Sequence, residues 1–154
     1  MRNVWIVIGV TAAAIMAAFF VCVAGILFLA PIRNDSVSKK TADSLANLPL
    51  PEDTELIEKV YKTGKLVGNG NGTQYFEAIL IKSSLSLEEL KAYYSGFAEH
   101  EWECAVENQE ESRISLVEHG NLTFQTEMEG DEYYIVYSWG SNQGIFHELD
   151  LRGH

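Results

Sequence analysis

The sequence predicts an α+β protein in which an N-terminal transmembrane helix precedes a small antiparallel sheet with one helix packed on it. Three observations lead to this prediction: a long apolar run near the N-terminus, two strand-like segments around a turn, and a helix with a clear N-terminal cap. We divide the chain into a transmembrane signal-anchor helix over residues 1–32, a linker over 33–50 and an acidic α+β domain over 51–154.

The apolar run extends from Val4 to Ala30 and contains 27 residues without a charge. At about 1.5 Å per residue, a helix of this length crosses a hydrocarbon core of about 30 Å. A cleaved signal peptide and a lipoprotein signal at Cys22 are the alternatives. Both are disfavoured, because Phe28 lies where a small residue should precede cleavage after Ala30, and bulky residues precede Cys22. We therefore expect the helix to remain in the membrane.

The charges around this run give opposing indications of its orientation. Arg2 precedes the run, whereas Arg33, Lys39 and Lys40 follow it, and an excess of basic residues usually marks the cytoplasmic side. A very short N-terminal tail before one long span is, however, the usual layout of a signal anchor with an exported domain. We favour export, which predicts a single-pass cell-membrane protein with an extracytoplasmic domain.

Small residues form a stripe along the predicted span, at Gly9, Ala13, Ala17 and Gly25. Small side chains at this spacing allow two helices to approach closely. The stripe is a candidate helix–helix contact in the membrane; the alternative is that Gly and Ala are simply common in such helices.

The region from residue 51 onward carries 20 acidic and 7 basic residues. So acidic a surface repels nucleic acid and anionic lipid head groups, so no nucleic-acid partner is expected. The charge either keeps the domain soluble or recruits cations or a basic partner. Cys104 is the single cysteine of this region, so the domain cannot form an internal disulfide.

Local patterns predict the elements in order. Residues 33–50 are polar without sustained periodicity and end at two prolines, which is typical of a linker. A hairpin is expected to pair residues 55–67 with 73–82 around the turn sequence NGNG. Ser86 and Glu89 form a capping box, so a helix should begin there and end between Gly96 and Glu99.

The remaining segments alternate apolar and polar residues and are separated by turn residues. Strand-like stretches lie at 102–108, 113–119, 122–128 and 132–139, and a further short strand is expected around residues 144–150. An antiparallel meander follows, and we write the predicted order as β-β-α-β-β-β with the helix laid across the sheet.

Residue types that carry chemistry are present but lack diagnostic spacing. Cys104 and His100 could form a nucleophile–base pair, yet no oxyanion-donor motif lies near them. The histidines lack paired ligand spacing, and residues 127–132, EMEGDE, lack the calcium-loop pattern. The histidines in question are His100, His119, His147 and His154. We predict no catalytic residue, no metal site and no cofactor.

Aromatic residues cluster in the last strong strand. They are Tyr133, Tyr134, Tyr137 and Trp139. Consecutive residues point to opposite faces of a sheet, so a face not covered by the helix would expose a ring. This group is a candidate ligand or partner face; ordinary strand propensity and dimer packing are the alternative.

The segment that starts with LPLPED and continues to SLEELKAYYSGFAEHEWE resembles small membrane-anchored or lipoprotein-like bacterial domains of unknown function. The matching residues are Pro49, Pro51, Glu88, Glu89, Tyr93, Tyr94 and Trp102, whereas Glu101 stands where those domains have Gly. The resemblance covers about half of the domain. It implies a location in the bacterial cell envelope and no established activity.

Together these patterns favour a non-enzymatic binding or assembly module of the cell envelope, held at the lipid bilayer. Its expected partner is another membrane or envelope protein, or a second copy of the chain. The alternative is a ligand-sensing domain that uses the open face of its sheet. A hydrolase is disfavoured, because the sequence shows no nucleophile–base constellation.

Overall fold

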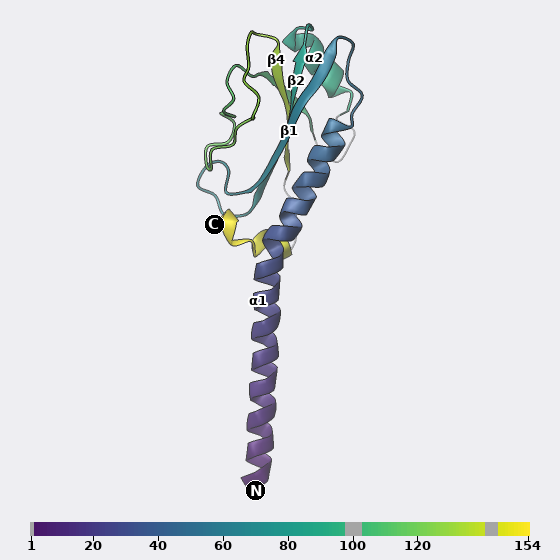
Figure 1. Ribbon diagram of the computed structural model, residues 1–154. Helices are drawn as coiled ribbons and strands as arrows, with labels where there is room; N and C mark the ends of the chain where they lie inside the picture. The colour runs from purple at the N-terminus through teal and green to yellow at the C-terminus, as the bar shows by residue number, and fades with distance from the viewer. Residues whose placement is uncertain (1, 98–102, 141–144) are drawn as a thin grey trace.

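The computed structural model describes residues 2–97, 103–140 and 145–154 and has the predicted α+β class. Its helices and strands follow one another as α1 (Arg2–Ala46), β1 (Thr54–Gly64), β2 (Gln74–Ser83), α2 (Leu87–Ser95), β3 (Ala105–Asn108), β4 (Tyr133–Gly140), α3 (Ile145–Glu148) and a 3₁₀ turn, η1 (Leu151–Gly153). A head formed by the sheet and its covering elements lies at one end of the long α1 (Figure 1). We call the end of the head nearest the apolar part of α1 proximal, and the opposite end distal.

Helix α1 contains the predicted span. Within the described residues it is the one helix long and apolar enough to cross a membrane, judged by length and composition. The side chains from Val4 to Phe20 are all exposed, and the helix projects away from the head (Figure 1). An N-terminal helix of this kind is consistent with a membrane anchor.

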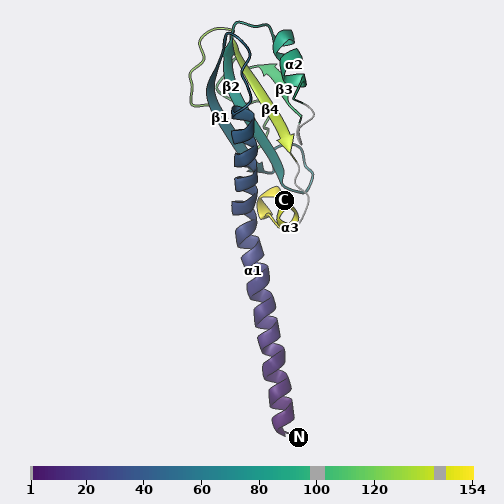
Figure 2. The same ribbon diagram turned by 90° about the vertical axis from the view of Figure 1, so that its right-hand side faces the viewer.

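The same helix continues through most of the segment over residues 33–50 that the sequence predicts to be a linker. It ends at Ala46, and its second half lies along the sheet (Figures 1 and 2). The helix residues that become buried against the head recur at every third or fourth position: Ala30, Asn34, Ser38, Ala42 and Leu45. Their spacing matches one face of a helix, but most of them are small or polar, so an apolar pattern was not visible.

Pro31 lies inside α1, close to the point where the helix meets the head. Proline cannot donate the usual backbone hydrogen bond and crowds the preceding turn, which bends a helix. The axis of α1 changes direction near this level (Figure 1). The bend allows one continuous helix both to project from the head and to follow the sheet.

The sheet has four antiparallel strands in the order β1-β2-β4-β3. The predicted hairpin is confirmed, with pairing from Thr54↔Ser83 to Gly64↔Gln74. β2 lies in the centre, and eight of its ten residues are buried. Helix α2 is confirmed as well, with both hydrogen bonds of the capping box between Ser86 and Glu89.

Both faces of the sheet are covered (Figure 2). One face packs against the end of α1 and against α2, and its buried apolar residues are Leu45, Ile79, Ile81, Leu90, Tyr94, Val106, Tyr134 and Val136. The other face lies under the segment between β3 and β4 and contains Leu66, Phe76, Ala78, Leu80, Ile114, Val117, Phe124, Ile135 and Tyr137. The head therefore has two thin apolar layers, one on each side of the sheet.

The predicted strands at 113–119 and 122–128 are wrong, and the observed order after α1 is β-β-α-β-β, one strand fewer than the predicted order. These residues form an irregular cover joined by one bridge, Arg113↔Thr123. The Glu58 side chain on β1 accepts hydrogen bonds from the backbone N–H groups of Gln125 (2.9 Å) and Thr126 (3.1 Å), so a side chain replaces a strand partner.

The strand expected around residues 144–150 is also wrong. Residue 144 lies outside the described residues, and Ile145 to Glu148 form the short helix α3. The following 3₁₀ turn, η1, begins beyond an Asp150 cap, whose carboxylate accepts a hydrogen bond from the backbone of Arg152. The C-terminus thus returns to the proximal end beside α1 (Figures 1 and 2).

Packing of the second half of α1 predicts that substitutions at neighbouring residues differ clearly in their effect on the stability of the head. Leu45→Ala should lower the free energy of unfolding of the head by about 2–5 kcal/mol, because Leu45 is fully buried. The exposed Ser44→Ala should change it by less than about 0.5 kcal/mol. Urea unfolding of the full chain in detergent measures both values. Equal, near-zero effects would mean that this part of α1 does not pack on the sheet.

Candidate functional site

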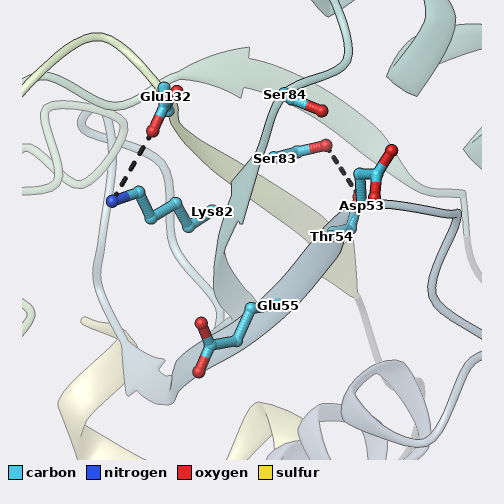
Figure 3. Close-up of a pocket in the computed structure, with 7 residues that line it drawn as sticks. All are labelled: Asp53, Thr54, Glu55, Lys82, Ser83, Ser84 and Glu132. Carbon is cyan, nitrogen blue, oxygen red and sulfur yellow. Dashed lines mark hydrogen bonds and ion pairs between the residues drawn. The ribbon is translucent and has the colours of Figure 1, made fainter.

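A shallow polar hollow lies at the distal end of the head. Its lining comes from the start of β1, the end of β2 and the residue before β4: Asp53, Thr54, Glu55, Lys82, Ser83, Ser84 and Glu132. The hollow has a volume of about 510 Å³. Three segments far apart in the sequence thus contribute to it (Figure 3). We call it the distal hollow.

The backbone of the distal hollow is held by hydrogen bonds between these segments. Ser84 donates its backbone N–H to the carbonyl of Asp53 (3.3 Å), and Ser83 donates to the carbonyl of Glu132 (2.9 Å). The hydroxyls of Thr54 and Ser83 lie 2.7 Å apart and share a hydrogen bond (Figure 3). Asp53 has a φ of 54°, a left-handed conformation that Asp and Asn tolerate better than most residues.

The charge of the distal hollow is predominantly negative. Lys82 forms an exposed ion pair with Glu132, with 3.5 Å between Nζ and Oε2. Asp53 and Glu55 add two exposed carboxylates that have no ion-pair partner in the described part of the chain. Figure 3 shows Glu55 projecting alone from β1. The arrangement suits an organic cation, such as an amine or a guanidinium, better than a metal, since the carboxylates do not converge.

A second polar cluster joins α1 to the C-terminus at the proximal end. We call its five residues, Asn34, Asp35, Thr63, Asp150 and Arg152, the junction network. The Asp150 carboxylate is fully buried and accepts hydrogen bonds from Asn34 Nδ2 (2.8 Å) and Arg152 Nη2 (2.8 Å). Burial acts to raise the pKa of Asp150, but the bonds from Arg152 and Asn34 hold it below its ordinary value.

The Arg152 guanidinium connects the rest of this network. It donates to Thr63 Oγ1 (2.9 Å) and to the carbonyl of Pro31 (3.1 Å), and forms an ion pair with Asp35 (3.0 Å). The Asp35 carboxylate also accepts a hydrogen bond from Thr63. Because these donors and acceptors are paired with one another, the network has a structural role and fixes the C-terminus against α1.

Glu77 lies on the sheet face that α1 covers. Its carboxyl is buried, and the whole residue is 1% exposed. Ser38 of α1 donates a hydrogen bond of 2.6 Å to its Oε1 atom. The Oε2 atom has no hydrogen-bond partner among the described residues, and the nearby buried hydroxyls of Tyr75 and Ser138 lack one too. Burial raises the pKa of Glu77 to about 7, against the opposing effect of the Ser38 bond.

The predicted aromatic face is not open, which corrects the expectation of an uncovered sheet. Tyr134 is buried with α2 and donates to the carbonyl of Leu85 (2.9 Å). Tyr137 is buried on the opposite face and donates to Glu107 (2.6 Å), while Tyr133 is half-buried against the same apolar layer. Trp139 is 38% exposed. The rings thus lie on both faces of the sheet, and Trp139 is the most exposed of the four, so their role as a ligand or partner face stays a prediction.

The small-residue stripe in α1 is accessible. Gly9, Ala13 and Ala17 are exposed and Gly25 is partly exposed, and a Cβ atom added at either glycine would meet nothing within 4 Å. The head therefore does not occupy the stripe at these positions. Helix–helix contact through it stays a prediction.

The other candidates for chemistry do not come together. His100 lies outside the described residues, so the pairing with Cys104 that the sequence disfavours falls outside them too. Burial raises the pKa of the Cys104 thiol to about 11. His119 and His154 each contact a backbone carbonyl, and His147 stacks on Tyr75. Within the described ranges, no group of three or more His, Cys, Asp or Glu residues is arranged to hold a metal ion.

The position of Glu77 predicts a specific pH dependence. The pKa of about 7 in the folded head exceeds the ordinary value of 4.5, so the folded state holds the proton more tightly than the unfolded chain. Ionisation of Glu77 therefore lowers the free energy of unfolding as the pH rises from about 4.5 to about 7. As the pH rises from 4.5 to 8, the free energy of unfolding of Glu77→Gln should therefore increase relative to that of the parent chain, by on the order of 3 kcal/mol in total.

Urea unfolding of the full chain in detergent, repeated across this pH range, measures the gain. Glu110→Gln is the matched control, because Glu110 is exposed and its replacement should leave the pH profile unchanged. A stability difference between Glu77→Gln and the parent that stays constant with pH would contradict the burial of an ionisable Glu77.

Comparison of the whole chain with protein-family models, with curated proteins and with solved structures yields no match in any of the three.

Proposed function

We propose that this chain is a single-pass membrane-anchored module that presents a small acidic domain outside the cytoplasm. In this proposal the domain binds or assembles with another envelope protein and has no enzymatic activity. Its distal hollow contacts a basic group of the partner. Catalysis is not assigned, because the polar residues of the junction network are paired with one another and support the fold.

The continuity of α1 is the observation that carries this proposal. The helix runs from the apolar segment into the head, where Ala30 and every third or fourth position after it are buried against the domain. A retained helix of this kind supports a head held at a fixed distance from the bilayer. A flexible tether would instead allow the domain to swing over a large volume.

The position and charge of the distal hollow support its role as the contact for a partner. It lies at the end of the head farthest from the apolar part of α1, where a second envelope protein has free access. Its excess of carboxylates favours a lysine or arginine side chain of that protein. The ligand-sensing alternative loses its main support, since both faces of the sheet are covered.

Export of the head can be tested by thiol labelling. Ser84→Cys, placed in a chain that also carries Cys22→Ala and Cys104→Ser, provides one exposed thiol at the distal end. A membrane-impermeant maleimide should label it in intact cells to the same extent as in permeabilised cells. Labelling that requires permeabilisation would place the domain in the cytoplasm and overturn the export part of the proposal.

Binding through the distal hollow predicts a dependence on its three carboxylates. A photo-crosslinker at Ser84 should capture a partner in native membranes, and capture should fall by about tenfold in the triple variant Asp53→Asn, Glu55→Gln, Glu132→Gln. Asn is chosen at position 53 because it keeps the left-handed backbone. Raising the salt concentration should weaken capture in the parent chain.

A matched control removes three exposed carboxylates elsewhere, at Glu110, Glu127 and Glu129, and should leave the capture unchanged. Equal loss in both triple variants would indicate a general charge effect rather than a site. The absence of any product from Ser84 in native membranes would count against the assembly function.

A further inference from the structure

A groove at the proximal end lies between α1 and α3. It is lined by α1 residues from Leu29 to Lys40 and by Phe146 of α3, and its volume is about 420 Å³. Two basic side chains, Arg33 and Lys40, line it together with apolar ones, and of these Leu29 and Ile32 lie closest to the span along the helix. We call it the proximal groove.

The proximal groove lies at the level expected for lipid head groups. The apolar run of 27 residues has a length of about 40 Å, whereas a hydrocarbon core needs about 20 residues, or about 30 Å. The end of the run at Leu29, and Ile32 just beyond it, therefore reach the boundary between hydrocarbon and head groups. Arg33 is roughly 5 Å beyond Ala30 along the helix axis, which is within the head-group layer.

The charge of the groove differs from that of the domain as a whole. Arg33 and Lys40 are exposed, and within the described part of the chain neither forms an ion pair with a carboxylate. The Arg33 guanidinium lies over the ring of Phe146, 4.9 Å from its centroid. This contact orients the guanidinium and leaves its N–H groups available for a phosphate, which they can bind in a bidentate manner.

The C-terminal elements add apolar side chains at the same end. Ile145 of α3 is 55% exposed and Leu151 of η1 is 68% exposed. The junction network holds both elements against α1, through Asp150 and Arg152. Exposed aliphatic side chains beside basic ones are the composition of a surface that rests in the membrane interface.

We propose that the proximal groove binds the head group of an anionic phospholipid. Arg33 binds its phosphate, and Lys40, about 10 Å farther along the axis of α1, adds a second positive charge beyond it. Leu29, Ile32 and Phe146 pack against the glycerol and the first part of its acyl chains. The proposal rests on the membrane anchoring proposed above and adds a ligand to it. It also gives the junction network a purpose, since the network fixes Phe146 and the C-terminus at the height of the head groups.

Native mass spectrometry of the full chain, solubilised in detergent with equal amounts of phosphatidylglycerol and phosphatidylcholine, tests this proposal. The parent chain should retain phosphatidylglycerol on the order of tenfold more than phosphatidylcholine. The double variant Arg33→Gln, Lys40→Gln should reduce this preference to about twofold or less. Phe146→Ala should weaken retention as well, because it removes the ring that orients Arg33.

The matched control is Lys39→Gln, Lys91→Gln, which removes two exposed positive charges that do not line the groove. It should keep the parent preference. Equal retention of the two lipids by the parent chain, or equal loss in the two double variants, would overturn the proposal. Displacement of the lipid by millimolar inorganic phosphate would also overturn it, because the site would then take a soluble anion.

Extraction of membranes with alkaline carbonate, before any lipid is measured, separates this proposal from the anchoring on which it rests. A chain released into the soluble fraction would overturn both. A chain that stays in the membrane pellet but shows no lipid preference would overturn the lipid site alone.

Discussion

Close packing of α1 against the sheet is the contact on which the arrangement of the whole chain depends. The helix presents small side chains at Ala30, Ser38 and Ala42, so its backbone can lie near β1 and β2. Because the same helix contains the apolar run, the geometry of one helix sets the position of the head relative to that run. The bend at Pro31 then sets the direction in which the head leaves it. Any movement of the span within a membrane would thus be transmitted to the sheet.

Polar contacts make this docking specific. Alanines alone on a helix face would tolerate sliding along the sheet, because they lack distinctive shape or hydrogen-bonding groups. Asn34 and Ser38 are one turn apart, and each reaches a buried carboxylate, Asp150 and Glu77 respectively. A shift of α1 by one turn would leave both carboxylates without these donors, which is costly for buried charges. Burial of the Glu77 carboxyl lowers the stability of the head. This loss is consistent with a role of Glu77 in fixing the register of the helix, which is the best-attested use of buried polar groups.

Elements governed by local rules were predictable from the sequence, whereas those assembled from distant segments were not. The hairpin follows from alternation around NGNG, and α2 follows from the cap at Ser86. The continuation of α1 was missed because its buried face is small and polar. The alternation in residues 122–128 predicted a strand, yet Glu58, more than sixty residues away, satisfies the backbone there. The same irregular cover buries Tyr137, and the distal hollow combines three separated segments, so neither the closed aromatic face nor the hollow had a local signal.

Three basic residues near the apolar run and three carboxylates at the distal end constrain how the head would stand on a membrane in the anchoring proposed above. Basic residues 33, 39 and 40 lie on α1 near the span, whereas the carboxylates of Asp53, Glu55 and Glu132 lie at the distal end. An anionic bilayer attracts the first group and repels the second, and each effect fades within a Debye length of about 8–10 Å. A head that tilted toward the bilayer would bring carboxylates into this zone. In the membrane anchoring proposed above, the packing of α1 and the electrostatics therefore favour the same upright orientation, with the distal hollow directed away from the lipid.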